Sequence, residues 1–182
     1  MSSTDRIFLF GPRACGKSTV GRALAQELRG WPFVDIDYEY LLLARVDGDA
    51  PREGNGTPPP RDYYADCRQL LLEHLTKPRG IFALSGGSLI NEVAPEIGLR
   101  NLQDCRRHGR LVLVLPSRFD RRNRGIIAER EAKRHYALAA AHSTKHYNSR
   151  IEFFRNCADL TVCGTEPARL AKKIIRHYQL TS

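Results

Sequence analysis

The chain has 182 residues, of which 42% are hydrophobic and 27% charged, so a disordered chain and a membrane protein are both excluded. Its length predicts one domain with a buried core. The net charge of +9 arises within residues 100–155, which carry 14 Lys and Arg against five Asp and Glu, while the remainder is balanced. Such a basic region attracts anions, or it forms a solvated helix face.

Apolar runs alternate with longer amphipathic segments along the chain, which predicts alternating strands and helices. The expected strands are residues 7–10, 33–35, 81–84, 111–115 and 160–163, and the expected helices are 18–28, 62–75, 91–107, 129–157 and 167–178. This order predicts an α/β fold, a doubly wound five-stranded parallel sheet with helices on both faces. Residues 47–61 are rich in Gly and Pro and predict a long loop.

The apolar run at residues 7–10 is too short for the hydrophobic segment of a signal peptide, and no stretch approaches the roughly 20 apolar residues of a membrane-spanning helix. The five cysteines are scattered and form no C-x-x-C pair, which favours a reducing compartment over a disulfide framework or a zinc site. We therefore expect a cytoplasmic protein with no membrane partner. We also expect a monomer. Few aromatic residues accompany the arginines of 100–155, so we do not expect a nucleic-acid partner.

Residues 11–18, Gly-Pro-Arg-Ala-Cys-Gly-Lys-Ser, match the pattern G-x-x-x-x-G-K-[ST] between a predicted strand and a predicted helix. The glycines allow a tight turn, so that backbone N–H groups point at one phosphate, and the helix N-terminus adds its positive field. Lys17 is expected to reach the β- and γ-phosphates, and the Ser18 hydroxyl to bind Mg²⁺. The predicted nucleotide-phosphate site comprises Gly11, Ala14, Cys15, Gly16, Lys17, Ser18 and Thr19.

Asp35 and Asp37 follow the second predicted strand, and in an extended segment both side chains would point to the same face. Parallel strands of a doubly wound sheet open at their carboxyl ends onto the ligand crevice, beside the phosphate loop. One carboxylate could then hold Mg²⁺ through water, and the other could orient a substrate hydroxyl and take its proton. Alternatively, Asp37 only caps a helix that begins at Tyr38. The nearby phosphate loop favours the functional interpretation.

Three segments, GPRACGKSTVGRALA, FVDID and LSGGSL, resemble motifs of the shikimate kinases. These are small P-loop kinases of the nucleoside-monophosphate-kinase type, which phosphorylate the 3-hydroxyl of shikimate with ATP and Mg²⁺ in aromatic amino acid biosynthesis. The resemblance implies a single kinase domain with its core at about residues 1–37, 77–116 and 156–182, a substrate-binding region at about 38–76 and a short lid at about 117–131.

The resemblance also implies catalytic roles for Lys17 and for residues beyond the phosphate loop. It assigns Asp35 to the Mg²⁺ shell, and Asp37 to the substrate hydroxyl as the candidate base. Arg124, in the segment RGII, resembles the lid arginine that folds over the γ-phosphate and stabilises charge during transfer. Arg121 is a candidate lid or adenine-stacking residue, and Pro167 resembles a proline near the adenine pocket.

For the acceptor, Gly86 and Gly87 resemble a glycine motif at the third strand end that lets a backbone N–H approach the substrate, with Ser85 as a departure from it. Arg150 resembles a late arginine that grips the substrate carboxylate with both of its N–H groups. The family's F-R-x-x-E motif places a second such arginine where this chain has Tyr64. Either Arg61 or Arg68 replaces it by a shifted register, or this contact is missing.

The sequence therefore predicts an ATP-dependent kinase that transfers the γ-phosphoryl group to a hydroxyl of a small carboxylic acid, with shikimate as the leading candidate. The missing F-R pair and the 47–61 loop favour another acceptor, such as a sugar acid, a cyclitol or a nucleotide. A nucleotide-binding module without catalysis is a third possibility. The presence of Asp37 and Arg150 argues against it, because binding ATP alone requires neither.

Overall fold

The computed structural model describes residues 5–46, 63–134 and 139–181. They contain a five-stranded parallel sheet of order β2-β3-β1-β4-β5. Its strands are β1 (Asp5–Phe10), β2 (Phe33–Asp35), β3 (Arg79–Ala83), β4 (Arg110–Leu115) and β5 (Leu160–Cys163). The predicted doubly wound α/β fold is thereby confirmed.

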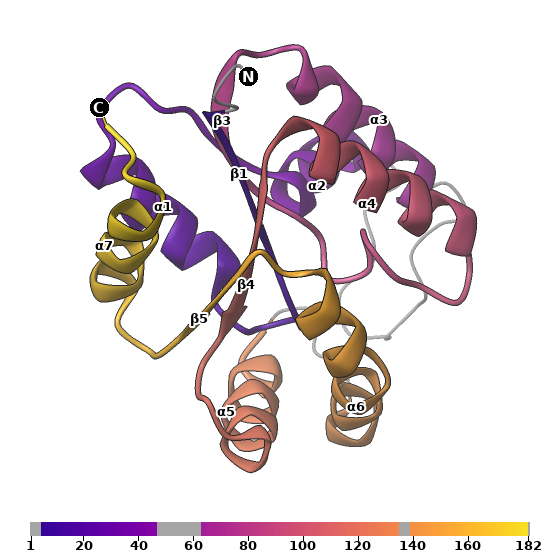
Figure 1. Ribbon diagram of the computed structural model, residues 1–182. Coiled ribbons are helices and arrows are strands. Elements are labelled where there is room, and N and C mark those ends of the chain that lie inside the picture. Colours follow the sequence, from indigo (N-terminus) through magenta and orange to yellow (C-terminus); the bar gives the residue numbers. More distant parts are fainter. Residues whose placement is uncertain (1–4, 47–62, 135–138, 182) are drawn as a thin grey trace.

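The helices cover both faces of the sheet and the carboxyl ends of its strands. They are α1 (Lys17–Glu27), α2 (Ile36–Val46), α3 (Tyr63–Leu75), α4 (Pro95–His108), α5 (Asp120–Ala132), α6 (Ala140–Cys157) and α7 (Pro167–Tyr178). Helices α1 and α7 pack together on one face, and α3 and α4 lie on the other with α2 beside α3 (Figure 1). Helices α5 and α6 pack against each other beyond the carboxyl ends of the strands.

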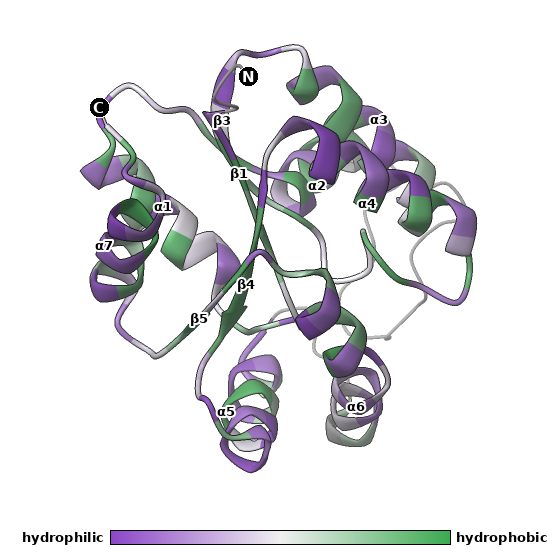
Figure 2. Cartoon of the chain, in the orientation of Figure 1, coloured by the Kyte–Doolittle hydropathy of each residue, from purple (hydrophilic) through white to green (hydrophobic). Residues whose placement is uncertain are grey.

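The core lies between these layers, and hydrophobic colour follows the central strands (Figure 2). The apolar residues of β1 and β4 are buried, as is typical of central parallel strands covered on both faces. Trp31 precedes β2, at the amino ends of the parallel strands and so away from α5 and α6. It is buried and donates a hydrogen bond from Nε1 to the Thr181 carbonyl oxygen at 3.2 Å. No helix in the described part of the chain is long and apolar enough to cross a membrane.

Two predicted helices differ from the structure. The single helix predicted over 129–157 is wrong, because α5 ends at Ala132 and α6 begins at Ala140. Residues 133–139 contain no Gly or Pro, so the sequence carries no ordinary stop signal there. The helix predicted from residue 91 begins at Pro95 instead. Asn91 accepts the Ala94 N–H and donates to the Gly87 carbonyl oxygen, which holds a turn before the helix. The loop predicted at 47–61 lies outside the described residues.

Candidate active site

A cavity of about 510 Å³ lies where the phosphate loop meets the first turn of α2, the end of α5 and the start of α7. The predicted nucleotide-binding residues 14–19 and Pro167 all line it. Two carboxylates and five cationic side chains also face it: Asp35, Asp37, Arg13, Lys17, Arg22, Arg130 and Arg134. Its charged lining is therefore mostly basic, which suits an anionic ligand.

The phosphate loop depends on backbone conformations that favour glycine. Gly11 has φ +141° and Gly16 has φ +108°, and a Cβ atom at Gly11 would lie 2.8 Å from the Val114 carbonyl oxygen. Gly16 precedes α1 as its N-cap, where no side chain of the described residues caps the helix and no acidic residue lies in the first turn. The N–H groups that begin α1 are therefore suited to an anion.

Lys17 is buried inside the loop, with 7% of its surface exposed. Its Nζ donates to the carbonyl oxygens of Gly11 at 3.2 Å and Pro12 at 3.1 Å. These contacts hold the ammonium at the loop, where it can exchange a carbonyl partner for a phosphate oxygen. The predicted phosphate role of Lys17 is consistent with this position.

Hydrogen bonds and an ion pair join the last turn of α5 to the phosphate loop. Arg130 donates to the Cys15 carbonyl oxygen at 3.3 Å, and Arg13 Nε lies 2.7 Å from an oxygen of the buried Glu131 carboxylate. Arg130 and Arg134 were not among the residues singled out from sequence. The sequence predicts one continuous helix over 129–157, and such a helix gives no reason to place Arg130 and Arg134 at the phosphate loop.

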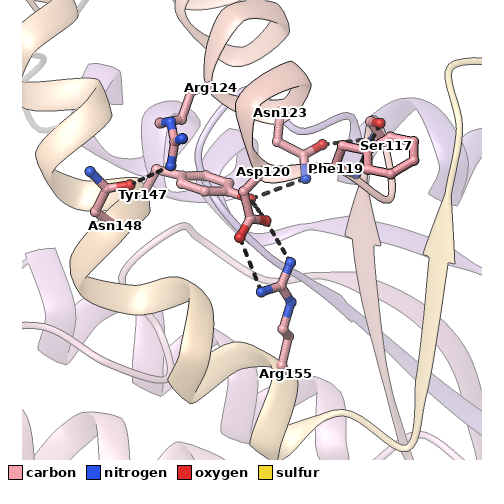
Figure 3. A network of polar contacts seen from close by, with 8 residues as sticks. All are labelled: Ser117, Phe119, Asp120, Asn123, Arg124, Tyr147, Asn148 and Arg155. Atoms are coloured by element: carbon pink, nitrogen blue, oxygen red, sulfur yellow. Dashed lines mark hydrogen bonds and ion pairs between the residues drawn. The ribbon is translucent and has the colours of Figure 1, made fainter.

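A polar network holds α5 against α6 and the end of β4 (Figure 3). Asn123 is fully buried, accepts the Ser117 N–H at 2.7 Å and donates to the Tyr147 hydroxyl at 3.0 Å. Burial raises the pKa of Tyr147 to about 12, so the phenol keeps its proton and donates to Asp120 at 2.7 Å. Asp120 also pairs with Arg155. This network fixes the helix whose last turn carries Arg130, with Arg134 two residues beyond its end.

The two predicted lid arginines lie elsewhere on α5. Arg124 donates to Asn148 Oδ1 on α6 at 3.2 Å (Figure 3), and Arg121 is exposed. Neither lines the cavity. Arg130 is thus the arginine of α5 that contacts the phosphate loop in this conformation, and the roles predicted for Arg121 and Arg124 would require α5 to move.

The acidic pair reaches the cavity in a different way from the one predicted. Asp35 ends β2 and Asp37 lies in the first turn of α2, so the segment is not extended through both residues. The alternative that Asp37 caps a helix is also wrong, since Asp35 Oδ1 accepts the Tyr38 N–H at 3.4 Å. Asp37 instead accepts a hydrogen bond from the Tyr63 hydroxyl at 2.7 Å through Oδ1.

A second cluster lies just beyond β3. Arg150, on α6, donates to the Gly86 carbonyl oxygen at 3.3 Å. A Cβ atom at Gly87 would lie 2.9 Å from the Tyr64 ring, so Gly87 allows that ring to approach the backbone. Burial raises the pKa of Tyr64, and the positive charge of Arg150 opposes the rise. The predicted acceptor residues Gly86, Gly87 and Arg150 therefore meet at this strand end.

The two candidates for the second arginine have different outcomes. Arg61 lies outside the described residues. Arg68 donates to Asn101 Oδ1 at 2.7 Å and to Asp104 Oδ2 at 3.0 Å, and so links α3 to α4. Because its guanidinium is engaged with these two residues of α4, the structure does not support Arg68 as a substrate clamp. Tyr64 occupies the place expected for the clamp.

Comparison with known proteins gives a consistent family. The family model for shikimate kinase matches residues 13–179. A shikimate kinase 2 of Yersinia enterocolitica is 30% identical over 132 residues, 71% of this chain and 64% of that protein. A shikimate kinase 2 of Yersinia pseudotuberculosis is 30% identical over 114 residues, 63% of this chain and 59% of that protein. The match thus spans about three fifths of the length of these curated relatives.

Solved structures share the fold. A shikimate kinase from Acinetobacter baumannii in complex with shikimate has a TM-score of 0.69 at 19% identity, over 96% of this chain and 93% of that one. The shikimate kinase from Aquifex aeolicus has a TM-score of 0.70 at 21% identity, over 96% of both chains. A gluconokinase from Sinorhizobium meliloti has a TM-score of 0.55 at 15% identity, over 97% of this chain and 94% of that one.

Proposed function

The chain belongs to the shikimate kinase family, and on this premise we propose that it transfers the γ-phosphoryl group of ATP to a hydroxyl of a small carboxylic acid, with shikimate as the leading acceptor. One observation carries the proposal: the phosphate loop and two carboxylates share one cavity. Cytoplasmic location and a monomeric state belong to the same proposal.

The nucleotide phosphates would lie on the N–H groups that begin α1. Lys17 and Arg130 would supply positive charge there, since Lys17 is held by the Gly11 and Pro12 carbonyls and Arg130 by the Cys15 carbonyl. Fixed donors of this kind stabilise the charge that develops during phosphoryl transfer. Pro167 lies at the same cavity, where the base of the nucleotide is expected.

Ser18 and Asp35 are the residues that would hold Mg²⁺. Both line the cavity, and a hydroxyl and a carboxylate are the oxygen donors that this ion prefers. Within the described residues no three His, Cys, Asp or Glu side chains form a metal cluster, so phosphate oxygens would complete the coordination. The ion would neutralise charge on the phosphates.

Asp37 would orient the acceptor hydroxyl and take its proton. The hydroxyl oxygen forms a bond to the γ-phosphorus, the bond from that phosphorus to the bridging oxygen breaks, and ADP leaves. Arg150 would bind the acceptor carboxylate beside Gly86 and Gly87, where its guanidinium already contacts the backbone. The acceptor would therefore bridge from the end of β3 to Asp37.

Tyr64 supports a second candidate acceptor. Tyr64 lies against Gly87, at the position where the family motif has a second arginine. Arg68, the other candidate, is paired with Asp104. Removing one of two buried contacts to a carboxylate costs about 2–5 kcal/mol, which is enough to change the preferred acceptor. A sugar acid, a cyclitol or a nucleotide is the alternative.

The test is ADP release by the purified protein with Mg²⁺-ATP, with and without shikimate, and with Lys17→Ala as the blank. Strong stimulation by shikimate would support the proposed reaction. Stimulation only by a member of an acceptor panel of gluconate, myo-inositol and nucleoside monophosphates would support the alternative. ATP binding without stimulation by any acceptor would contradict both and indicate a nucleotide-binding module.

A further inference from the structure

The contact between Tyr63 and Asp37 joins two helices at the centre of the proposed acceptor site. Tyr63 is the first residue of α3, and its hydroxyl donates to Asp37 Oδ1 at 2.7 Å. No hydrogen bond between described residues ends on Asp37 Oδ2. A hydrogen bond to an ionised carboxylate is stronger than one between neutral groups, so it can fix the carboxylate plane.

The Tyr63 ring is itself held in place. It packs edge-to-face against Tyr40, with ring centroids 4.7 Å apart, and against Tyr64, with centroids 5.0 Å apart. Burial and the neighbouring Asp37 carboxylate raise the pKa of Tyr63 well above its usual value. The phenol therefore stays protonated at neutral pH and acts as a donor.

We propose that Tyr63 is a positioning residue that fixes Asp37 Oδ1 and so leaves Oδ2 for the acceptor hydroxyl. This inference rests on the proposed function of Asp37. Tyr63 does not touch the reacting atoms; it acts through Asp37.

The fold does not depend on this hydroxyl alone. Helices α2 and α3 are also joined by Glu39 and His74, whose Oε2 and Nε2 atoms lie 2.6 Å apart. The substitution Tyr63→Phe keeps the ring that packs against Tyr40 and Tyr64. It therefore removes the hydrogen bond and preserves the packing.

The experiment compares acceptor-stimulated ADP release in wild type, Tyr63→Phe, Asp37→Ala and the double variant. We expect Tyr63→Phe to lower kcat about tenfold with less than a twofold change in the ATP KM, because a hydrogen bond to a charged group has about this strength. In the Asp37→Ala background, the same change should lower kcat less than twofold.

Tyr178→Phe is the matched control, since it removes a phenol hydroxyl at the end of α7 and should leave kcat unchanged. If no acceptor in the panel stimulates the wild type, the proposed function fails and the inference falls with it. If the wild type is active and Tyr63→Phe is equally active, only the inference is overturned. A tenfold loss that persists in Asp37→Ala would overturn it too, because Tyr63 would then act independently of Asp37.

Discussion

The phosphate loop occupies residues 11–18, whereas the acceptor end gathers side chains from α2, α3, α6 and the turn after β3. In the loop, backbone N–H groups and two glycine conformations form most of the site. At the proposed acceptor end, individual side chains such as Tyr64 and Arg150 would determine which acceptor binds. We therefore expect most side-chain changes to affect acceptor choice more than nucleotide binding.

Lys17→Ala should have the largest effect on turnover, because it impairs the reaction that needs both the phosphate loop and the acceptor end. We expect kcat to fall about 100- to 1,000-fold, because a preorganised positive group is removed from the transferring phosphate. Thermal unfolding should show that the fold persists. Lys172→Ala, which removes an exposed lysine from α7, is the control, and equal turnover in the two variants would contradict the role of Lys17.

Arg150→Ala should weaken acceptor binding without weakening ATP binding. Its guanidinium contacts Gly86 at the acceptor end and does not line the cavity with the phosphate loop. We expect the acceptor KM to rise about 30-fold or more, as for a lost hydrogen bond to a charged group, with the ATP KM within twofold of wild type. Steady-state kinetics with each substrate varied would measure this. Equal increases in both KM values would remove Arg150 from the acceptor site.

Tyr64→Arg should strengthen binding of a carboxylate acceptor. If shikimate is the acceptor and Tyr64 occupies the place of a second carboxylate clamp, an arginine there should lower the shikimate KM about tenfold. Tyr64→Gln, which is polar but uncharged, is the control. An unchanged KM for every carboxylate acceptor in a folded variant would show that this position does not face the carboxylate.

Arg155→Ala should have the smallest effect, on stability alone. Hydrogen bonding by Arg155 holds the pKa of Asp120 below its usual value of 3.8. A lowered pKa in the folded state stabilises the protein at neutral pH, and this contribution disappears as the pH falls below about 4. Both side chains are over one third exposed, so we expect a loss below about 1 kcal/mol at pH 7.

Urea unfolding at pH 7 and pH 3 would measure this difference, with Arg169→Ala on α7 as the control. The gap between wild type and Arg155→Ala should narrow at pH 3. A gap that is equal at both pH values would show that the Asp120 pair does not cause it.

The parallel sheet and the phosphate loop were predictable because their signals are local. An apolar run, two glycines and a lysine lie within a dozen residues, and the structure places them as expected. The contacts of Arg130 with Cys15 and of Tyr63 with Asp37 were not predictable, because they join residues far apart in the chain. The break between α5 and α6 also lacked a local signal, so the side chains beyond it could not be assigned to the site.

Trp31 is the single tryptophan of the chain, and it is buried beside Thr181 at the end of the sheet opposite the phosphate loop. Its fluorescence emission is therefore an intrinsic reporter of global unfolding, set apart from the ligand site. None of the hydrogen bonds and ring contacts of Trp31 among the described residues involves Lys17, Tyr63 or Arg150, so we expect substitutions there to leave its surroundings unaltered. One optical signal can thus compare the folding of every active-site variant without labelling the protein.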